Sequence, residues 1–257
     1  MWAWLQKLFS KAPEQPEKAP EKPIDYLPVA LQVTGKFEGS TYSTITGNFD
    51  GQGLSAGILQ WNLGQGSLQA MLLKYQQDYG IARGAFPEPV EPLCDVTPKE
   101  AIALSLKMQD GTKLKPEWEK AWKAFLSTDG MVKIQQDFCR ERWNKALELC
   151  ARWNLKSIRA KCWFFDLVVQ NGSLKGVELE PTPARSLSLA DPDNAKLWST
   201  MDLNTEQLML LKASSDRALL STEAYRRDVF QRKAIIATDK GWLHGAYYDF
   251  GLVFHQD

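Results

Sequence analysis

Apolar residues recur about every 3.6 positions over most of the chain from residue 97 onward, which is the pattern of amphipathic helices. One stretch, "TPKEAIALSLKMQ", opens with a capping box, since Pro98 follows Thr97 and Glu100 lies three residues after it. Residues 177–200 hold three prolines with weak periodicity, which predicts an irregular segment. The periodic stretches predict helices over residues 97–109, 117–127, 131–153, 157–173, 204–220 and 222–237.

The pattern in the first part of the chain is different. Pro28 suits a first helical turn, and Gly35 and Gly39 weaken and then end the helix. Glu38 is therefore predicted to lie at a helix C-terminus. Residues 40–63 are rich in Thr, Gly, Phe, Ile and Trp, which predicts a short twisted hairpin or a three-stranded piece. The resulting fold class is α+β, mainly α.

Residues 1–11 and 12–23 are predicted to be separate from the domain that follows, residues 24–257. The segment 12–23, "APEQPEKAPEKP", alternates Pro with Glu and Lys and favours an extended tether. In residues 1–11, four apolar side chains would share one helical face: Trp2, Leu5, Leu8 and Phe9. This short amphipathic segment either docks on a partner or a membrane surface, or folds back on the domain. We expect neither a Sec signal, because no small-residue cleavage site follows, nor a membrane span.

The charge balance argues against one large class of partners. The chain has 31 basic and 31 acidic residues among 257, so its formal net charge is zero and we expect no nucleic acid partner. Its four cysteines have no CxxC spacing and it has only two histidines, which argues against a zinc site or a thiol relay. We therefore expect no metal and no cofactor.

Two carboxylates, Glu38 and Asp50, lie close to the glycine-rich run "ITGNFDGQGLSAGILQWN". Glycoside hydrolysis needs two such groups, one that protonates the leaving oxygen and one that activates water or attacks the sugar. The helix end favours protonated Glu38, and the glycine-rich turn offers backbone N–H donors to Asp50. A solvated pair without function would have the same spacing. A calcium loop is rejected because Leu59 stands where a bidentate Glu belongs, and a phosphate loop because no Gly-Lys-Ser/Thr ends the run.

The run "DGQGLSAGIL", which begins at Asp50, resembles the D-G-x-G-Y-T-x-G-I run around the catalytic Asp of family 46 chitosanases, members of the lysozyme superfamily. Glu38 matches the general acid of that family. The stretch "FFDLVVQNGS", residues 164–173, is similar to its buried core helix, and "RRDVFQRKAIIATDKGWLHG" is more weakly similar to a late helix and turn. The resemblance implies a two-lobed, mainly helical, lysozyme-like fold with a cleft for a β-1,4-linked amino-sugar polymer.

The resemblance also implies a role for each residue of the motif. Glu38 would be the general acid and Asp50 the base that holds a nucleophilic water. Ser55, where the family has Thr, would supply a hydroxyl that positions this water. The mechanism would invert the anomeric centre if the two carboxyl groups lie roughly 6.5 to 9.5 Å apart.

The expected substrate follows from the departures from the family. Chitosanases are secreted and line their clefts with acidic groups for a cationic polymer, whereas the motif here is followed by neutral hydrogen-bonding groups and an aromatic ring: Gln60, Trp61, Asn62 and Gln65. Such groups suit N-acetylated sugars, so we expect a muramidase that cleaves peptidoglycan. Chitosan is the alternative substrate, and a non-catalytic cell-wall binding module with the same fold is the alternative of another class.

Such a muramidase would be a phage lysin or an antibacterial effector. It would be made in the cytoplasm without a Sec signal and act in the periplasm or cell wall after release or secretion, with residues 1–11 as the contact for a delivery or immunity protein. Near the late turn in "GWLHGAYYD", His244 and Tyr247 are expected to contact the substrate. Trp61 and Trp242 neighbour turns and are candidates for stacking on sugar rings.

Asp166 lies in the apolar run "CWFFDLVVQ" and would be buried if that helix is central. A buried carboxylate needs a partner. We expect a structural ion pair with an arginine of "YRRDVFQRK", such as Arg226 or Arg227.

Overall fold

The computed structural model describes residues 24–38, 40–80, 85–174, 176–177 and 187–254, with the side chains of Glu38 and Glu91 outside the description. The helices are α1 (Leu27–Glu38), α2 (Ser67–Tyr79), α3 (Pro98–Ser105), α4 (Pro116–Leu126), α5 (Asp129–Arg152), α6 (Ile158–Asn171), α7 (Pro192–Thr200), α8 (Thr205–Leu219), α9 (Glu223–Thr238) and α10 (Gly251–Phe254). The strands are β1 (Ile45–Thr46), β2 (Ser55–Ala56), β3 (Trp61–Asn62), β4 (Gln109–Asp110), β5 (Lys113–Leu114), β6 (Lys240–Leu243) and β7 (Ala246–Asp249). The predicted α+β, mainly α, class is confirmed.

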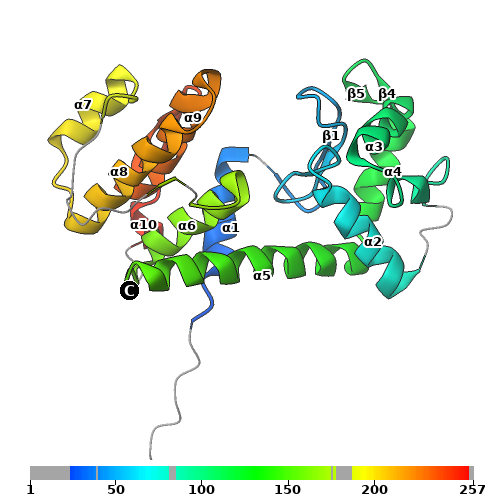
Figure 1. The fold of residues 1–257 in the computed structure, drawn as a ribbon, viewed down its shortest axis with the longest axis horizontal. Coiled ribbons are helices and arrows are strands. Elements are labelled where there is room, and N and C mark those ends of the chain that lie inside the picture. Colours follow the sequence, from blue (N-terminus) through cyan, green and yellow to red (C-terminus); the bar gives the residue numbers. More distant parts are fainter. Residues whose placement is uncertain (1–23, 39, 81–84, 175, 178–186, 255–257) are drawn as a thin grey trace, which may run out of the picture.

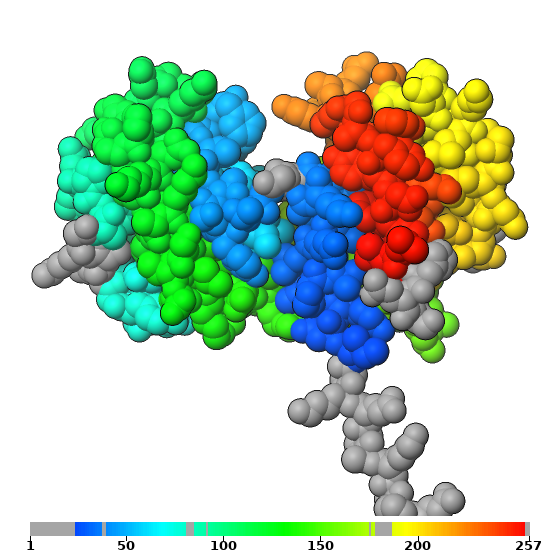
Figure 2. Space-filling model, turned by 180° about the vertical axis from the view of Figure 1, so that it is seen from behind, coloured from blue at the N-terminus to red at the C-terminus, as the bar shows by residue number. Residues whose placement is uncertain are grey.

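Two lobes share the long helix α5, which runs beneath both of them (Figure 1). One lobe holds α2, α3 and α4 with the strands β1 to β5, and the other holds α1 and α6 to α10 with the hairpin β6–β7. Helix α5 contacts α2 in the first lobe and α6 in the second. Seen from behind, the surface is notched between the lobes, where the last turn of α1 lies (Figure 2).

Local sequence signals account for several helix starts. Thr97 and Glu100 form the predicted capping box at the start of α3. The hydroxyl of Ser157 caps α6 by accepting a hydrogen bond from the backbone N–H of Ala160 at 3.0 Å. Helix α1 ends at Glu38, as the glycine pattern predicted, so the sequence placed this candidate acid at a helix C-terminus.

The segment 177–200 was wrongly predicted to be irregular throughout, because its last nine residues form α7. Asp191 precedes a proline at the first helical position, which is a start signal. Trp198 is fully buried and donates a hydrogen bond from Nε1 to the carbonyl oxygen of Lys240 at 2.7 Å. The packing of α7 against β6 thus stabilises a helix whose own periodicity is weak.

The two predicted N-terminal segments, residues 1–11 and 12–23, lie outside the described residues. In the part of the chain that is described, no helix is long and apolar enough to cross a membrane. Cys139, Cys150 and Cys162 are buried thiols without a disulfide.

Candidate active site

The three-stranded sheet places the residues of the Asp50 motif. Strand β2 lies in the centre and pairs with both neighbours, so that Ser55 lies opposite Thr46 on one side and Asn62 on the other. This confirms a three-stranded piece within residues 40–63. The three paired side chains come from stretches up to 16 positions apart, and the pairing brings them to one place.

The turn between β1 and β2 carries Asp50 and is held by polar side chains. Asn48 donates its backbone N–H to Oε1 of Gln109 at 2.7 Å and accepts a hydrogen bond from the N–H of Gly53 on its Oδ1 at 2.8 Å. Gly47 packs so closely on β4–β5 that a Cβ atom there would lie 2.2 Å from the carbonyl oxygen of Thr112. The turn is therefore anchored to the rest of its lobe.

Asp50 lies at the exposed tip of this turn. As the glycine-rich sequence suggested, a backbone N–H of the turn, that of Gln52, donates to Oδ1 of Asp50 at 3.0 Å. This hydrogen bond orients the carboxylate. Such an acceptor can hold a water molecule or take a proton from it.

A cavity of about 520 Å³, here called the sheet pocket, lies against the sheet. It brings together six of the residues that the sequence analysis named for the site: Asp50, Ser55, Gln60, Trp61, Asn62 and Gln65. Polar residues that were not predicted also line it, among them Arg142 from α5 and Gln170 from α6. The candidate base and the candidate water-positioning hydroxyl thus share one cavity.

Trp61 is a wall of the sheet pocket and not an open platform. Its side chain is 2% exposed, and the ring of Phe138 packs edge-on against it with the ring centroids 6.5 Å apart. A sugar ring can stack only on an exposed aromatic face. In this conformation Trp61 shapes the cavity and supports its other residues.

A second cavity of about 470 Å³, the helix pocket, lies against α9. Gln170 lines both this cavity and the sheet pocket, so the two cavities meet at this side chain, and they are together called the cleft below. His244 lines the helix pocket, where its Nε2 lies 3.2 Å from Oδ1 of Asp228. Tyr247 lines neither cavity and packs on Trp242, with ring centroids 4.9 Å apart.

The last turn of α1 borders the cleft. Phe37 lines the helix pocket and its ring lies 5.1 Å from the guanidinium carbon of Arg232. Glu38 follows directly as the last residue of α1, and its side chain lies outside the described residues. The general-acid role of Glu38 therefore stays a prediction, supported by its place in the chain beside a cleft-lining residue.

A buried ion cluster lies beneath the cleft. Asp166 is fully buried and accepts hydrogen bonds from Arg232 at 2.7 and 2.9 Å and from Lys233 at 3.0 Å. Burial raises the pKa of Asp166, but the two cations together outweigh this effect and hold its pKa at about 2. The prediction of a structural ion pair with an arginine of "YRRDVFQRK" is confirmed, because Arg232 belongs to this run, whereas the two arginines named as examples, Arg226 and Arg227, do not pair with Asp166.

The position of Arg226 and Arg227 on α9 explains why they do not pair with Asp166. Arg226 and Arg227 lie one to two turns before the cluster on α9, where Arg226 donates to the carbonyl oxygen of Ser221 and Arg227 lies 3.4 Å from Asp191. The face of α9 that packs on α6 begins further along the helix. Only the packing decides which basic residue faces Asp166.

The same cluster orients Gln170. Lys233 donates to Oε1 of Gln170 at 2.8 Å, and since an ammonium group can only donate, this atom is the amide oxygen. Among the described residues, the amide nitrogen of Gln170 has no hydrogen-bond partner. Because Gln170 lines both cavities, this donor is available to a ligand there.

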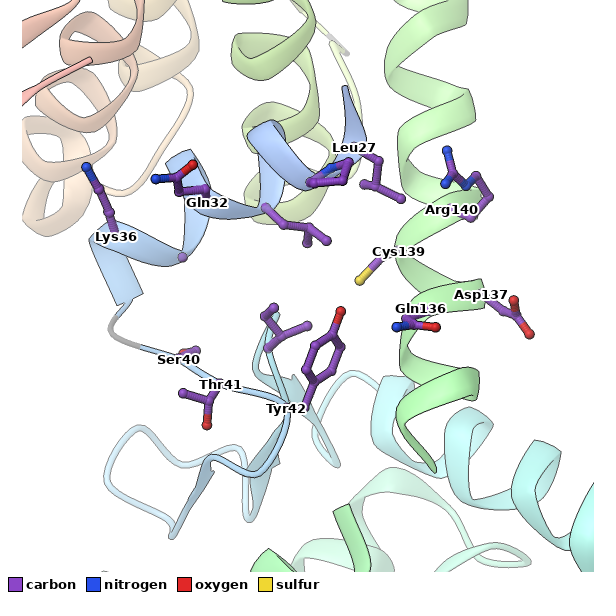
Figure 3. Close-up of a pocket in the computed structure, with 14 residues that line it drawn as sticks. Leu27, Gln32, Lys36, Ser40, Thr41, Tyr42, Gln136, Asp137, Cys139 and Arg140 are labelled. Atoms are coloured by element: carbon purple, nitrogen blue, oxygen red, sulfur yellow. The ribbon is translucent and has the colours of Figure 1, made fainter. Parts of the chain in front are cut away.

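A third cavity, of about 810 Å³, lies elsewhere, between α1 and α5 (Figure 3). Tyr42 and Cys139 point toward one another across it, whereas Asp137 and Arg140 point away. Burial raises the pKa of Cys139 to about 12, so this thiol is not a nucleophile near neutral pH. The cavity contains neither Asp50 nor Ser55, and its residues offer no acid/base pair that points inward.

Solved structures with the same arrangement of elements are known. No protein-family model matches the sequence, and no curated protein matches it. The Gynuella sunshinyii family 46 chitosanase GsCsn46A, solved with chitotetraose, superposes with a TM-score of 0.54 at 14% identity, covering 89% of this chain and 98% of that one. Chitosanase OU01, solved with substrate, gives a TM-score of 0.52 at 16% identity, covering 89% and 97%.

The fold resembles that of family 46 chitosanases. The resemblance stated from the Asp50 run is thereby confirmed at the level of the fold.

Two cleft residues, Arg142 and Gln170, were missed in the sequence. Gln170 lies four positions after Asp166 on α6, so both occupy one helix face, and this spacing is a signal that could have found it. Arg142 lies in the middle of α5 among other charged residues, and nothing in the sequence distinguishes it from them.

Proposed function

We propose that the protein is a glycoside hydrolase that cleaves a β-1,4-linked amino-sugar polymer, with peptidoglycan as its substrate. The observation that carries the proposal is the sheet pocket, in which Asp50 and Ser55 of the predicted motif share one cavity, in a fold whose structural neighbours include a chitosanase bound to chitotetraose. In the proposed reaction, Glu38 protonates the glycosidic oxygen. Asp50 takes a proton from a water molecule that Ser55 helps to position, and that water attacks the sugar from the opposite face.

The polar groups of the cleft favour an N-acetylated polymer. Gln170 presents its amide donors, and Asn62 uses its Oδ1 for the N–H of Gln65 at 2.8 Å, which leaves its amide nitrogen for a ligand. An acetamido carbonyl accepts such hydrogen bonds, whereas the ammonium groups of chitosan are donors. Among the described residues that line the two cavities, the carboxylates are Asp50 and Asp228. Two carboxylates provide little negative charge to bind a polycation such as chitosan.

If peptidoglycan is the substrate, the place where the protein acts follows from it. The protein would act in the periplasm or cell wall after release or secretion, and a delivery or immunity protein would be its protein partner. A chitosanase activity is the second candidate function, because the neighbours named above are chitosanases.

Substrate preference is tested with purified polymers. We expect wild type to release at least about ten times more reducing ends from peptidoglycan than from fully deacetylated chitosan, a factor that corresponds to about 1.4 kcal/mol between the two transition states. The products are identified by mass spectrometry, with Asp50→Asn as the inactive control. Cleavage of chitosan alone would replace peptidoglycan by the second candidate, and cleavage of neither polymer by wild type would contradict the proposed activity.

A further inference from the structure

Arg142 is a cation in the sheet pocket. Its side chain projects from the middle of α5, lines the cavity with Asp50 and Ser55, and lies over the ring of Trp61 with the guanidinium carbon 5.9 Å from the ring centroid. Burial lowers the pKa of Arg142, and the group stays charged near neutral pH. The pocket therefore contains a half-buried positive charge beside the candidate catalytic base.

Toward the described residues, the guanidinium of Arg142 leaves most of its hydrogen-bond donors unused. Its hydrogen bond to protein is from Nη1 to the carbonyl oxygen of Phe138, one helical turn earlier, and this bond is long at 3.4 Å. A guanidinium has five N–H donors in a planar fork. Among the described residues no carboxylate lies within 4.0 Å of it, although Asp50 shares the pocket and Glu141 is its neighbour on α5.

The two arginines that are buried among the described residues, Arg159 and Arg232, are paired. Arg159 donates to both carboxylate oxygens of Asp239 at 2.6 and 2.8 Å, and Arg232 donates twice to Asp166. A guanidinium withdrawn from water without a counter-ion is costly, and natural proteins pair such groups. The half-buried Arg142 has no carboxylate partner among the described residues, and it lines the pocket where a ligand would bind.

We propose that Arg142 binds a carboxylate carried by the glycan in the sheet pocket. In peptidoglycan the carboxylate would come from the lactyl group of a muramoyl residue or from the peptide attached to it. The planar fork of an arginine matches a carboxylate in two parallel hydrogen bonds, and its contact with the fixed ring of Trp61 limits the freedom that binding would remove. The inference rests on the proposed function, since it names the substituent that the same cleft recognises.

The same charge would act against chitosan. An ammonium group of a deacetylated sugar in the sheet pocket would lie near Arg142, and like charges in a partly desolvated pocket repel. Arg142 thus supplies both an attractive element for an anionic glycan and a repulsive one for a cationic glycan.

The test compares the binding of three tetrasaccharides of equal length to Glu38→Gln, which lacks the candidate acid and does not consume them. The first is neutral, built from N-acetylglucosamine alone, the second carries peptide-free lactyl carboxylates, and the third carries lactyl groups with peptide attached. We expect calorimetric titration to give at least tenfold tighter binding for a carboxylate-bearing ligand than for the neutral one. Preference for the second ligand assigns the lactyl carboxylate, and preference for the third alone assigns the peptide.

Adding Arg142→Gln should remove this preference while leaving affinity for the neutral tetrasaccharide within about twofold, and Arg142→Lys should keep part of it because the charge remains. Arg152→Gln, at the exposed end of the same helix, is the matched control and should keep the full preference. Circular dichroism checks that each variant is folded.

Equal affinity for all three ligands, or a preference that survives in Arg142→Gln, would overturn the inference. Cleavage of peptidoglycan by wild type would then show that the proposed function still stands. If none of the three ligands binds and wild type cleaves no polymer, the proposed function fails, and this inference fails with it.

Discussion

Glu38→Gln and Asp50→Asn should each lower peptidoglycan cleavage at least about 100-fold while the protein stays folded, since a positioned acid or base contributes about 100- to 10,000-fold. Glutamine has no proton to donate to the glycosidic oxygen, and asparagine cannot take one from water. Both substitutions keep the size of the side chain. The rate of release of reducing ends measures the effect, and the thermal unfolding temperature shows that folding is unchanged.

The control for this pair is Glu148→Gln, which removes an exposed carboxylate of α5 and should leave the rate unchanged. A binding module would give a different result. Its wild type would bind the polymer in a sedimentation assay without cleaving it, and neither Glu38→Gln nor Asp50→Asn would change that binding. Substantial cleavage by Asp50→Asn would remove Asp50 from the mechanism and with it the role of the sheet pocket.

Asp166→Asn should lower the free energy of unfolding by about 3 to 5 kcal/mol, which is the usual cost of removing one partner of a buried ion pair. The substitution leaves Arg232 and Lys233 without their shared counter-ion, and the Lys233 side chain is fully buried. Urea denaturation followed by tryptophan fluorescence measures the change. Asp78→Asn, which breaks an exposed pair with Lys74 at 2.6 Å, is the matched control and should cost less than about 1 kcal/mol.

The dependence of the free energy of unfolding on pH should also show the contribution of Asp166. The pKa of Asp166 is about 2 in the folded protein against an ordinary value of 3.8, so the unfolded chain binds its proton more tightly. The carboxylate therefore contributes stability that is present above pH 3.8 and is lost as the pH falls through about 2. In Asp166→Asn this loss of stability between pH 3.8 and about 2 should be absent. If the variant and wild type lose stability equally over this pH range, the pKa of Asp166 is the same in the folded and the unfolded chain, which contradicts the prediction.

Local signals account for the elements that the sequence predicted well. Helix α1 ends at Glu38 because glycines follow closely, and α3 begins at a capping box, so each boundary depends on residues only a few positions apart. Hydrophobic periodicity located α4, α5, α6, α8 and α9 for the same reason. Helix α7 was missed because its stability comes from Trp198 and Asn194 packing on the hairpin after α9, more than 40 positions away.

The sequence by itself determined that the protein is mainly helical with a short sheet near its start, and that Asp50 and Ser55 lie in one motif, because these features depend on near neighbours. Only the tertiary structure decided that Lys233 and Arg232 face Asp166, that Trp61 is buried, and that Arg142 enters the sheet pocket without a carboxylate partner among the described residues. Those outcomes join residues 66 to 92 positions apart, and the physical reason is that the packing of α5, α6 and α9 selects which side of each helix faces the cleft.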